Sequence, residues 1–207
     1  MPKPVIFLGP SLELSVASEI LDASYLPPIK RGDLAKLDRA VQTVGIVDGE
    51  FFQSLAVSPK EVLLLLDRGV RVFGSSSMGA LRAAELHTLG MMGVGRVFEM
   101  YRDGRIEADD EVALLYDPTT YRACSEPLVN LRCALNGAVQ KNVIGRLKAE
   151  EILSRLKELY FPYRTHRTVA LLCPELEEFM QALPSNQKRD DALLMLRTIA
   201  AWEANGE

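Results

Sequence analysis

The first third of the chain alternates short apolar runs with segments whose apolar residues recur at helical spacing. Apolar runs that predict buried strands lie at residues 5–8, 44–47 and 70–73. Each run ends at a turn that contains glycine, and helices are expected afterwards at about residues 12–22, 58–66 and 78–89. Buried strands that are each followed by a turn and a helix are typical of a parallel α/β sheet. A further strand is expected near residues 25–30, where Pro27 and Pro28 restrict it to an edge or an end of the sheet.

The pattern changes after about residue 93, where spacing and propensity indicate helices and no convincing strand. The predicted helices span residues 94–101, 111–115, 127–140, 146–160, 167–172, 176–183 and 190–202. The sequence therefore predicts an α/β fold, with a Rossmann-like parallel sheet in the N-terminal half and a mostly helical C-terminal half. We expect an α/β core domain at residues 1–117 and a helical region at 118–207 packed on it.

Composition narrows the class of protein. The chain has 207 residues, of which 48% are hydrophobic and 25% charged, as in an ordinary globular protein. Its net charge of -4 argues against a general nucleic-acid binder, which normally has a basic balance. No apolar stretch approaches the ~18 residues of a membrane span. We therefore expect no nucleic-acid partner and no membrane association.

Three cysteines, Cys124, Cys133 and Cys173, cannot all pair within one chain, and their spacing fits no zinc motif. A reducing cytoplasm is the simplest interpretation. We expect no metal and no cofactor.

Candidate chemistry lies where the predicted strands end, because ligands of open α/β sheets bind at the carboxyl ends of the strands. Three such ends are Gly9-Pro10-Ser11, Asp48-Gly49-Glu50 and Gly74-Ser75-Ser76-Ser77. The third leads directly into a predicted helix with no acidic residue before Glu85. The first-turn amides of that helix, at Met78 and Gly79, are therefore available to an anion or a developing oxyanion.

The serine-rich turn also approximates a nucleophile elbow. Ser77 would be the central serine of the G-x-S-x-G pattern, with Ser75 in place of the first glycine and Gly79 as the second. The alternative is that one serine caps the helix and the others line a turn.

A serine nucleophile needs a base. Asp48 is the best candidate if its strand adjoins that of Ser77, although a turn-forming role for Asp48 is equally common. His87 lies ten residues after Ser77 on the same predicted helix, a ~15 Å rise, and cannot be the partner. His166 reaches the site only if the helical half folds over it.

Other charged residues have two interpretations each. Glu85 lies on an apolar stripe with Arg82 three residues away, which predicts either a structural ion pair or a catalytic acid. Lys30 and Arg31 stand at a glycine turn, where they either hold a carboxylate or phosphate or belong to a solvated loop. Seven acidic residues between positions 99 and 117 form either a solvated face or a docking surface for a basic partner.

Several of these motifs together resemble the TfuA-like family. The most specific is Ser-Ser-Ser-Met-Gly-Ala-Leu-Arg-Ala-Ala-Glu-Leu at residues 75–86, and the others lie at residues 9–12, 28–33, 46–49 and 125–130. The resemblance spans about residues 4–135. It implies a partner of YcaO enzymes, which activate a backbone amide with ATP in ribosomal peptide tailoring, including thioamidation and trifolitoxin-type biosynthesis. The implied task is to release sulfide from a thiocarboxylated ThiS-like carrier protein, with the precursor peptide an indirect partner.

In this implied chemistry, we expect Ser77 to attack the thiocarboxylate or to position water, and Asp48 to act as base. Ser76 and Glu85 complete the expected catalytic set. The expected substrate-binding residues are Ser11, Lys30, Arg31, Ser75, Met78, Gly79 and Arg82. Cys124 is a further residue of interest because it precedes Ser125-Glu126-Pro127.

Two functional hypotheses remain open at this point. The first is a thiocarboxylate hydrolase that supplies sulfide to the YcaO enzyme. The second is a non-catalytic recruiter or allosteric activator that binds the YcaO enzyme or its substrate peptide. A nucleotide-binding Rossmann domain is a weaker third, because no G-x-G-x-x-G follows the first strand and there is no Walker motif.

Overall fold

The computed structural model describes residues 2–51, 54–182 and 186–205. The chain forms two compact units, which we call the sheet unit (Met1–Glu107 with Lys188–Glu207) and the helical unit (Ala108–Gln187). This division differs from the expected boundary at residue 117, because the chain returns at its end to the first unit. The physical reason is the apolar face of the last helix, which packs on the sheet.

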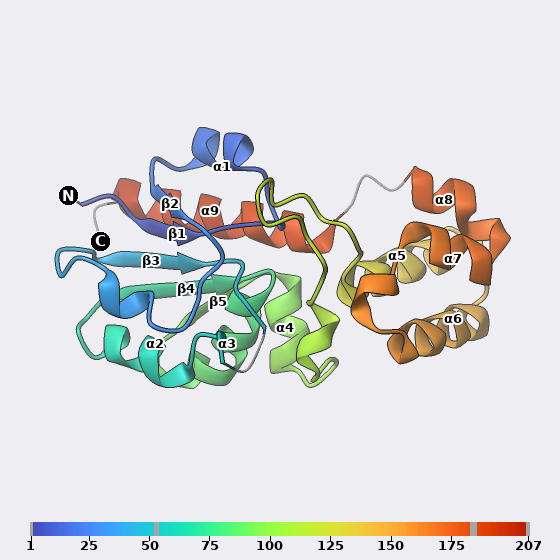
Figure 1. Cartoon of the computed structure of the whole chain (residues 1–207), viewed down its shortest axis with the longest axis horizontal. Helices are drawn as coiled ribbons and strands as arrows, with labels where there is room; N and C mark the ends of the chain where they lie inside the picture. The colour runs from blue at the N-terminus through green and yellow to red at the C-terminus, as the bar shows by residue number, and fades with distance from the viewer. Residues whose placement is uncertain (1, 52–53, 183–185, 206–207) are drawn as a thin grey trace. The chain divides into compact units, whose positions relative to one another are not determined.

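The sheet unit contains five parallel strands in the order β2-β1-β3-β4-β5, which confirms the predicted α/β fold (Figure 1). The strands are β1 (Val5–Phe7), β2 (Ser24–Leu26), β3 (Thr43–Ile46), β4 (Arg71–Ser75) and β5 (Met92–Val94). The central strands β1, β3 and β4 are those predicted from buried apolar runs. β2 is an edge strand that ends just before Pro27, as its prolines required.

β5 is a strand that the sequence pattern did not reveal. It contains only Met92, Gly93 and Val94, and it pairs with β4 at the second edge of the sheet. Gly93 is necessary there because a β-carbon at this position would overlap the ring of Phe98. A three-residue run with a central glycine has too little apolar periodicity to predict a strand.

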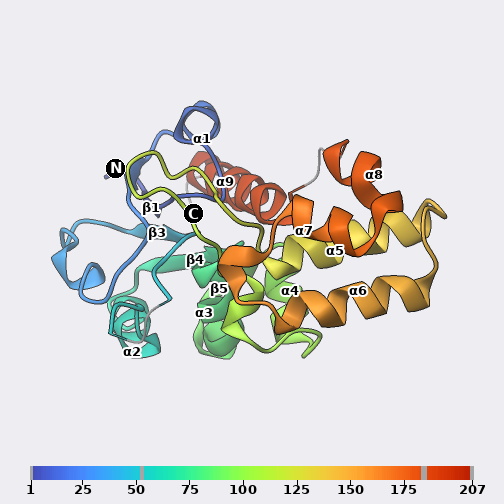
Figure 2. The same cartoon turned by 45° about the vertical axis from the view of Figure 1, so that its right-hand side comes forward.

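Helices cover both faces of the sheet (Figures 1 and 2). On one face, α1 (Leu14–Ile20) and α9 (Gln187–Asn205) pack on strand side chains such as Ile6 and Phe73. On the other, α2 (Pro59–Leu66) and α3 (Met78–Leu86) pack against β4, and α4 (Arg96–Arg102) packs beside α3. α2 begins with a capping box in which Ser58 and Glu61 satisfy each other's backbone amides.

The helical unit is built on a separate apolar core that includes Leu131, Leu156 and Leu176. Its helices are α5 (Leu128–Gln140), α6 (Arg146–Glu158), α7 (His166–Leu172) and α8 (Glu177–Gln181). No helix in the described part of the chain has both the length and the apolar character that crossing a membrane requires.

The helix predicted at residues 111–115 is wrong. A short 3-10 turn, Asp109–Glu111, is followed there by non-helical chain. Ion pairs hold this segment, because Asp110 pairs with the buried Arg164 and the buried Glu111 pairs with Arg132. These long-range pairs outweigh the local helix propensity of the segment.

Candidate functional site

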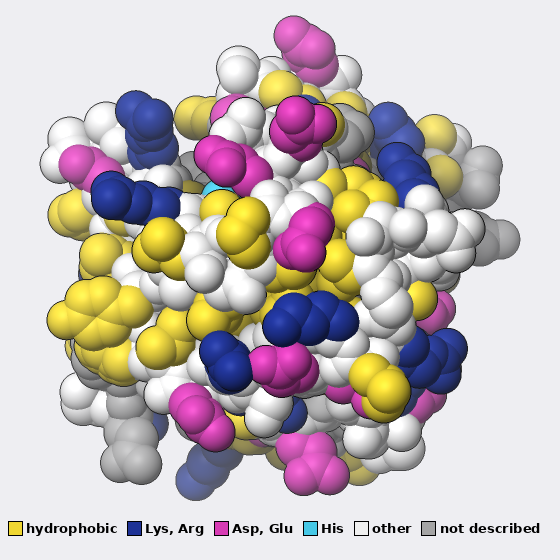
Figure 3. Space-filling model, turned by 90° about the vertical axis from the view of Figure 1, so that its right-hand side faces the viewer, with side chains coloured by type: hydrophobic (Ala, Val, Ile, Leu, Met, Phe, Trp, Pro, Cys, Tyr) yellow, Lys and Arg dark blue, Asp and Glu magenta, His cyan; other side chains and the backbone are white. Residues whose placement is uncertain are grey.

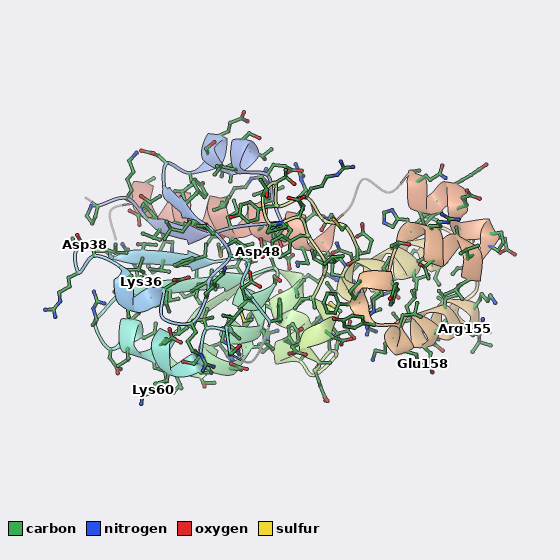
Figure 4. The ribbon with its side chains drawn as sticks, in the orientation of Figure 1. Lys36, Asp38, Asp48, Lys60, Arg155 and Glu158 are labelled. Carbon is green, nitrogen blue, oxygen red and sulfur yellow. The ribbon has the colours of Figure 1, made fainter. Side chains whose placement is uncertain are left out.

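The candidate site lies at the switch point of the sheet. In the order 2-1-3-4-5, the chain leaves β1 toward one edge and resumes at β3 on the other side of β1. Ligands of open α/β sheets bind at such a point, beyond the carboxyl ends of the strands. Gly9 and Ser11 follow β1, and Asp48 follows β3, at whose end it is labelled in Figure 4. Two strand ends that the sequence singled out therefore meet at this point.

Asp48 holds the loop after β1. Its Oδ2 atom accepts hydrogen bonds from the amides of Gly9 (2.9 Å) and Ser11 (3.0 Å), and its Oδ1 atom accepts one from the Ser11 hydroxyl at 2.6 Å. The residue is only 2% exposed. Asp48 therefore has a structural role like the turn-forming one that was its alternative interpretation. The loop that it holds, however, follows β1, whereas Asp48 itself follows β3. A carboxylate has about four acceptor sites, so Oδ1 retains one for another donor.

Lys188 joins this cluster from the first turn of α9. Its ammonium lies 3.9 Å from Asp48 Oδ1, and its side chain is as deeply buried as that of Asp48. A buried carboxylate is costly without a nearby positive charge, and Lys188 supplies it. No pattern in the sequence indicated Lys188, because it lies 140 positions after Asp48 and no local motif surrounds it.

The first two residues of the serine turn attach it to α9. The Ser75 hydroxyl hydrogen-bonds to the carbonyls of Val94 (2.8 Å) and Asp191 (2.9 Å). The Ser76 hydroxyl donates to the carbonyl of Lys188 at 2.8 Å. Both hydroxyls therefore have structural partners on the last helix.

The strained residue of the turn is Ser76, with a φ of 66°. Ser77, which we predicted as the centre of a nucleophile elbow, has a φ of -126°. A positive φ in a residue other than glycine costs of order 1–3 kcal/mol and persists only where surrounding contacts enforce it. The sharp bend therefore precedes Ser77, and the bond from Ser76 to α9 is one of the contacts that hold it.

Ser77 differs from its two neighbours. It occupies the N-cap position of α3, is 2% exposed, and makes no side-chain capping hydrogen bond. Its hydroxyl makes no hydrogen bond to another described residue, and its oxygen is not among the fully buried atoms that lack a partner. The capping role that was the structural alternative is therefore not seen for Ser77.

The start of α3 provides one of the two amides expected to hold an oxyanion. The Gly79 amide donates to the Val47 carbonyl at 3.3 Å and is thus used within the fold. The Met78 amide makes no backbone hydrogen bond to another described residue. No acidic side chain lies in this first turn, so the positive end of the helix is not offset there.

Two glycines allow α3 to start so close to the sheet. A β-carbon on Gly79 would overlap the carbonyl oxygen of Ile46, and one on Gly74 would overlap the carbonyl oxygen of Gly79. Gly79 is therefore required by close packing against β3, in addition to any role toward a ligand.

Arg82 and Glu85 form the ion pair that one of the two interpretations predicted. The Arg82 guanidinium lies 2.6 Å from the Glu85 carboxylate, whose side chain is 40% exposed. Arg82 Nε also donates to the Val57 carbonyl at 2.8 Å. Glu85 is eight residues after Ser77, a rise of ~12 Å along the helix.

Lys30 and Arg31 lie on a loop that continues β2 past the end of β3. Ile29 forms an isolated parallel bridge with Gly49, which brings the loop beside the residue that follows Asp48. Lys30 is exposed, with its ammonium 3.9 Å from Glu50. Arg31 is anchored by its Nε atom, which donates to the Ala56 carbonyl at 3.3 Å.

The other reactive side chains that the sequence offers include two histidines and two of the three cysteines. The His87 ring is exposed beside the Ala84 carbonyl, and His166 pairs with Glu126 within the helical unit. Cys124 is exposed in the helical unit. Burial, followed by a hydrogen bond to Glu175, raises the pKa of the Cys173 thiol and keeps it protonated.

Within the described ranges, no group of three His, Cys, Asp or Glu side chains is placed to hold a metal ion.

Comparison with known proteins gives one family. Residues 48–165 match a family model described as TfuA-like protein, which covers more than half of the chain. The match begins at Asp48 and includes the serine turn, but it leaves out Ser11 and Lys188. A comparison with curated proteins gave no significant match.

Proposed function

Because the chain belongs to the TfuA-like family, we propose that it hydrolyses a thiocarboxylated ThiS-like carrier protein and supplies the sulfide to a YcaO-family enzyme. The YcaO enzyme would use this sulfide in backbone thioamidation of a ribosomal peptide. The precursor peptide is then an indirect partner of the chain.

The observation that carries the proposal is the difference among three adjacent serines. Ser75 and Ser76 donate to carbonyls of α9, whereas the Ser77 hydroxyl has no hydrogen-bond partner among the described residues. A hydroxyl without a structural partner, on a residue that is 2% exposed at the positive end of a helix, is suited to act on an acyl group. Ser77 is therefore the residue that we assign to the reaction.

The overall reaction adds water to the acyl carbon. The oxygen of water bonds to this carbon, the carbon–sulfur bond breaks, and sulfur leaves as hydrosulfide. The carrier is left with an ordinary carboxylate and one proton is released. Ser77 would either attack first and form an acyl ester that water hydrolyses, or hold the attacking water.

The surrounding groups have complementary tasks. The Met78 amide would stabilise the developing oxyanion, because it is the first amide of α3 and makes no backbone hydrogen bond to another described residue. Asp48 would receive the proton at Oδ1, where one acceptor site remains. Lys30, on the loop beside Gly49, would attract the anionic thiocarboxylate.

The test is sulfide release from a thiocarboxylated ThiS-like carrier by the purified protein and its Ser77→Ala variant. We expect release by the wild type and a loss of about 10²-fold or more in the variant. Ser18→Ala, which removes an exposed hydroxyl from α1, is the matched control. Equal release by wild type and Ser77→Ala would overturn the assignment of Ser77, and no release by the wild type would overturn the hydrolase function.

A non-catalytic partner of the YcaO enzyme is the second candidate, and the surface of the helical unit favours it. Tyr160 and Tyr163 are 62% and 68% exposed, and Leu147 and Leu171 are more exposed still. The face drawn in Figure 3 carries exposed hydrophobic side chains among charged ones. Exposed apolar groups of this kind are common in protein-binding surfaces. Undiminished stimulation of the YcaO enzyme by Ser77→Ala would favour this function over hydrolysis.

A further inference from the structure

We propose that Lys188 is the positioning residue that holds the serine turn and Asp48 in one arrangement. This inference rests on the proposed hydrolase function, because it assigns a role at the same site. Lys188 contacts both parts of the site with different groups. Its carbonyl oxygen accepts the Ser76 hydroxyl at 2.8 Å, and its ammonium lies 3.9 Å from Asp48 Oδ1.

The backbone contact fixes the bend that precedes Ser77. Ser76 has a φ of 66°, a conformation that a residue other than glycine keeps only when its contacts demand it. The hydrogen bond to the Lys188 carbonyl is the contact of the Ser76 side chain. Loss of that contact would allow Ser76 to relax and would turn Ser77 away from its present direction.

The side-chain contact fixes the other part of the site. Asp48 is buried, and its negative charge is balanced by the ammonium of Lys188, which is buried to the same degree. Without this cation, a buried carboxylate is uncompensated, and the loop that it holds through Gly9 and Ser11 would rearrange toward water. Residue 188 of α9 therefore holds the bend before Ser77 through its backbone carbonyl and the proposed base through its side-chain ammonium.

This role is one of positioning, since Lys188 is paired within the protein and acts through Ser76 and Asp48. A positioning residue affects the reacting geometry more than the affinity for the carrier, so its loss should lower kcat with little change in KM. A purely structural role would instead lower the folded fraction and leave kcat per folded molecule unchanged.

The test compares Lys188→Met with Lys188→Arg, and uses Arg189→Met as the matched control. Arg189 carries the same charge on the next residue of α9, where it pairs with Glu13 at the surface. We expect Lys188→Met to lower kcat per folded molecule by about 10²-fold, and Lys188→Arg to regain most of the loss. Wild-type kcat in folded Lys188→Met would overturn the proposal.

A second variant covers the case in which Lys188→Met does not fold. Ser76→Gly removes the side chain whose hydroxyl bonds to the Lys188 carbonyl, and glycine accepts the positive φ at no steric cost. We expect a fall in kcat with KM preserved, smaller than that of Lys188→Met. An unchanged kcat in folded Ser76→Gly would contradict the proposal.

Hydrogen exchange separates this inference from the hydrolase function. In folded Lys188→Met we expect faster exchange at the peptides that cover residues 5–16, and in Ser76→Gly at the peptides that cover residues 71–82. Arg189→Met should leave both peptides unchanged. If the wild type releases no sulfide, the hydrolase function fails, whereas faster exchange still supports the role of Lys188. Faster exchange confined to α9 would overturn it.

Discussion

Both units bury a charged side chain that is hydrogen-bonded to backbone groups of another segment, but the two arrangements serve different ends. In the sheet unit, the Asp48 carboxylate accepts the amides of Gly9 and Ser11. In the helical unit, the Arg164 guanidinium donates to the carbonyls of Leu156 and Leu159. Each charge satisfies backbone groups that would otherwise be costly to bury.

The difference lies in what the partners are. Three of the carbonyls that Arg164 binds belong to the end of α6 and the residue after it, and every helix end leaves such carbonyls without internal partners. The amides that Asp48 binds belong to a loop at the switch point of a parallel sheet, where ligands of such folds bind. A buried charge therefore suggests function only when its position in the fold does so as well.

The first prediction tests whether Arg164 is a structural element of the helical unit. Arg164→Met removes the cation that joins α6 to Asp110, and leaves the carbonyls of Leu156 and Leu159 without their donor. We expect the free energy of unfolding of the helical unit to fall by about 3–5 kcal/mol.

Chemical denaturation with hydrogen exchange localised to residues 108–187 measures this change. Arg167→Met, which removes an exposed cation three residues later, is the control and should be nearly neutral. Equal stability of the two variants would show that the burial of Arg164 does not stabilise the unit.

The second prediction compares a helical glycine in each unit. Gly79→Ala should destabilise the sheet unit by about 1–3 kcal/mol, because the new methyl group overlaps the Ile46 carbonyl. Gly137→Ala in α5 should instead stabilise the helical unit by roughly 0.5–1 kcal/mol. Only the ring of Phe179 lies near, at an ordinary contact distance, and alanine favours helix.

Thermal or denaturant unfolding of both variants measures the two effects. A lower free energy of unfolding in Gly79→Ala and a higher one in Gly137→Ala would confirm that α3 lies closer to the sheet than a β-carbon allows, whereas α5 has room for one. A neutral Gly79→Ala would contradict the close approach.

The third prediction has the smallest expected effect and concerns Tyr25. Like Arg164, this residue binds carbonyls near the end of a helix, but its side chain is neutral. The Tyr25 hydroxyl is hydrogen-bonded to the carbonyls of Ala17 and Leu21 at the end of α1. Burial, and then the charge of Asp22, raise the pKa of Tyr25 to about 12 from its usual 10. The folded state keeps the proton longer, so this contribution to stability is complete below pH 10 and is lost as the pH rises toward 12.

Absorbance titration of the tyrosines in the wild type and in Tyr25→Phe measures this pKa. The late-ionising component should be absent from the variant. If the two titration curves coincide, Tyr25 ionises with the other tyrosines and the hydrogen bonds to α1 have no measurable weight.

The central strands and most helices were predictable from the sequence because their apolar residues recur at the strand or helix period. The edge position of β2 was predictable for a different reason, the prolines that follow it. β5 and the ion-paired segment after Glu107 were not predictable, since a short glycine-containing strand and long-range ion pairs leave no local pattern.

The candidate site was only partly predictable. The strand ends at Ser11, Asp48 and Ser77 could be located because each follows an apolar run. Lys188 and Asp191 could not, because a helix that returns to the sheet from far along the chain carries no local signal of what it contacts. The distinct roles of Ser75 and Ser76 likewise depend on their acceptors in α9.

The return of α9 to the sheet sets an order in time for the assembly of the protein. The helical unit is one continuous stretch of sequence between two parts of the sheet unit, and its contacts are mostly local, so it can fold soon after it leaves the ribosome. The sheet unit has all five strands by residue 94 but must wait for α9. Until then the Ser76 hydroxyl lacks its acceptor and the Ser75 hydroxyl lacks one of its two, so the serine turn is completed last, although it is encoded in the first half of the chain.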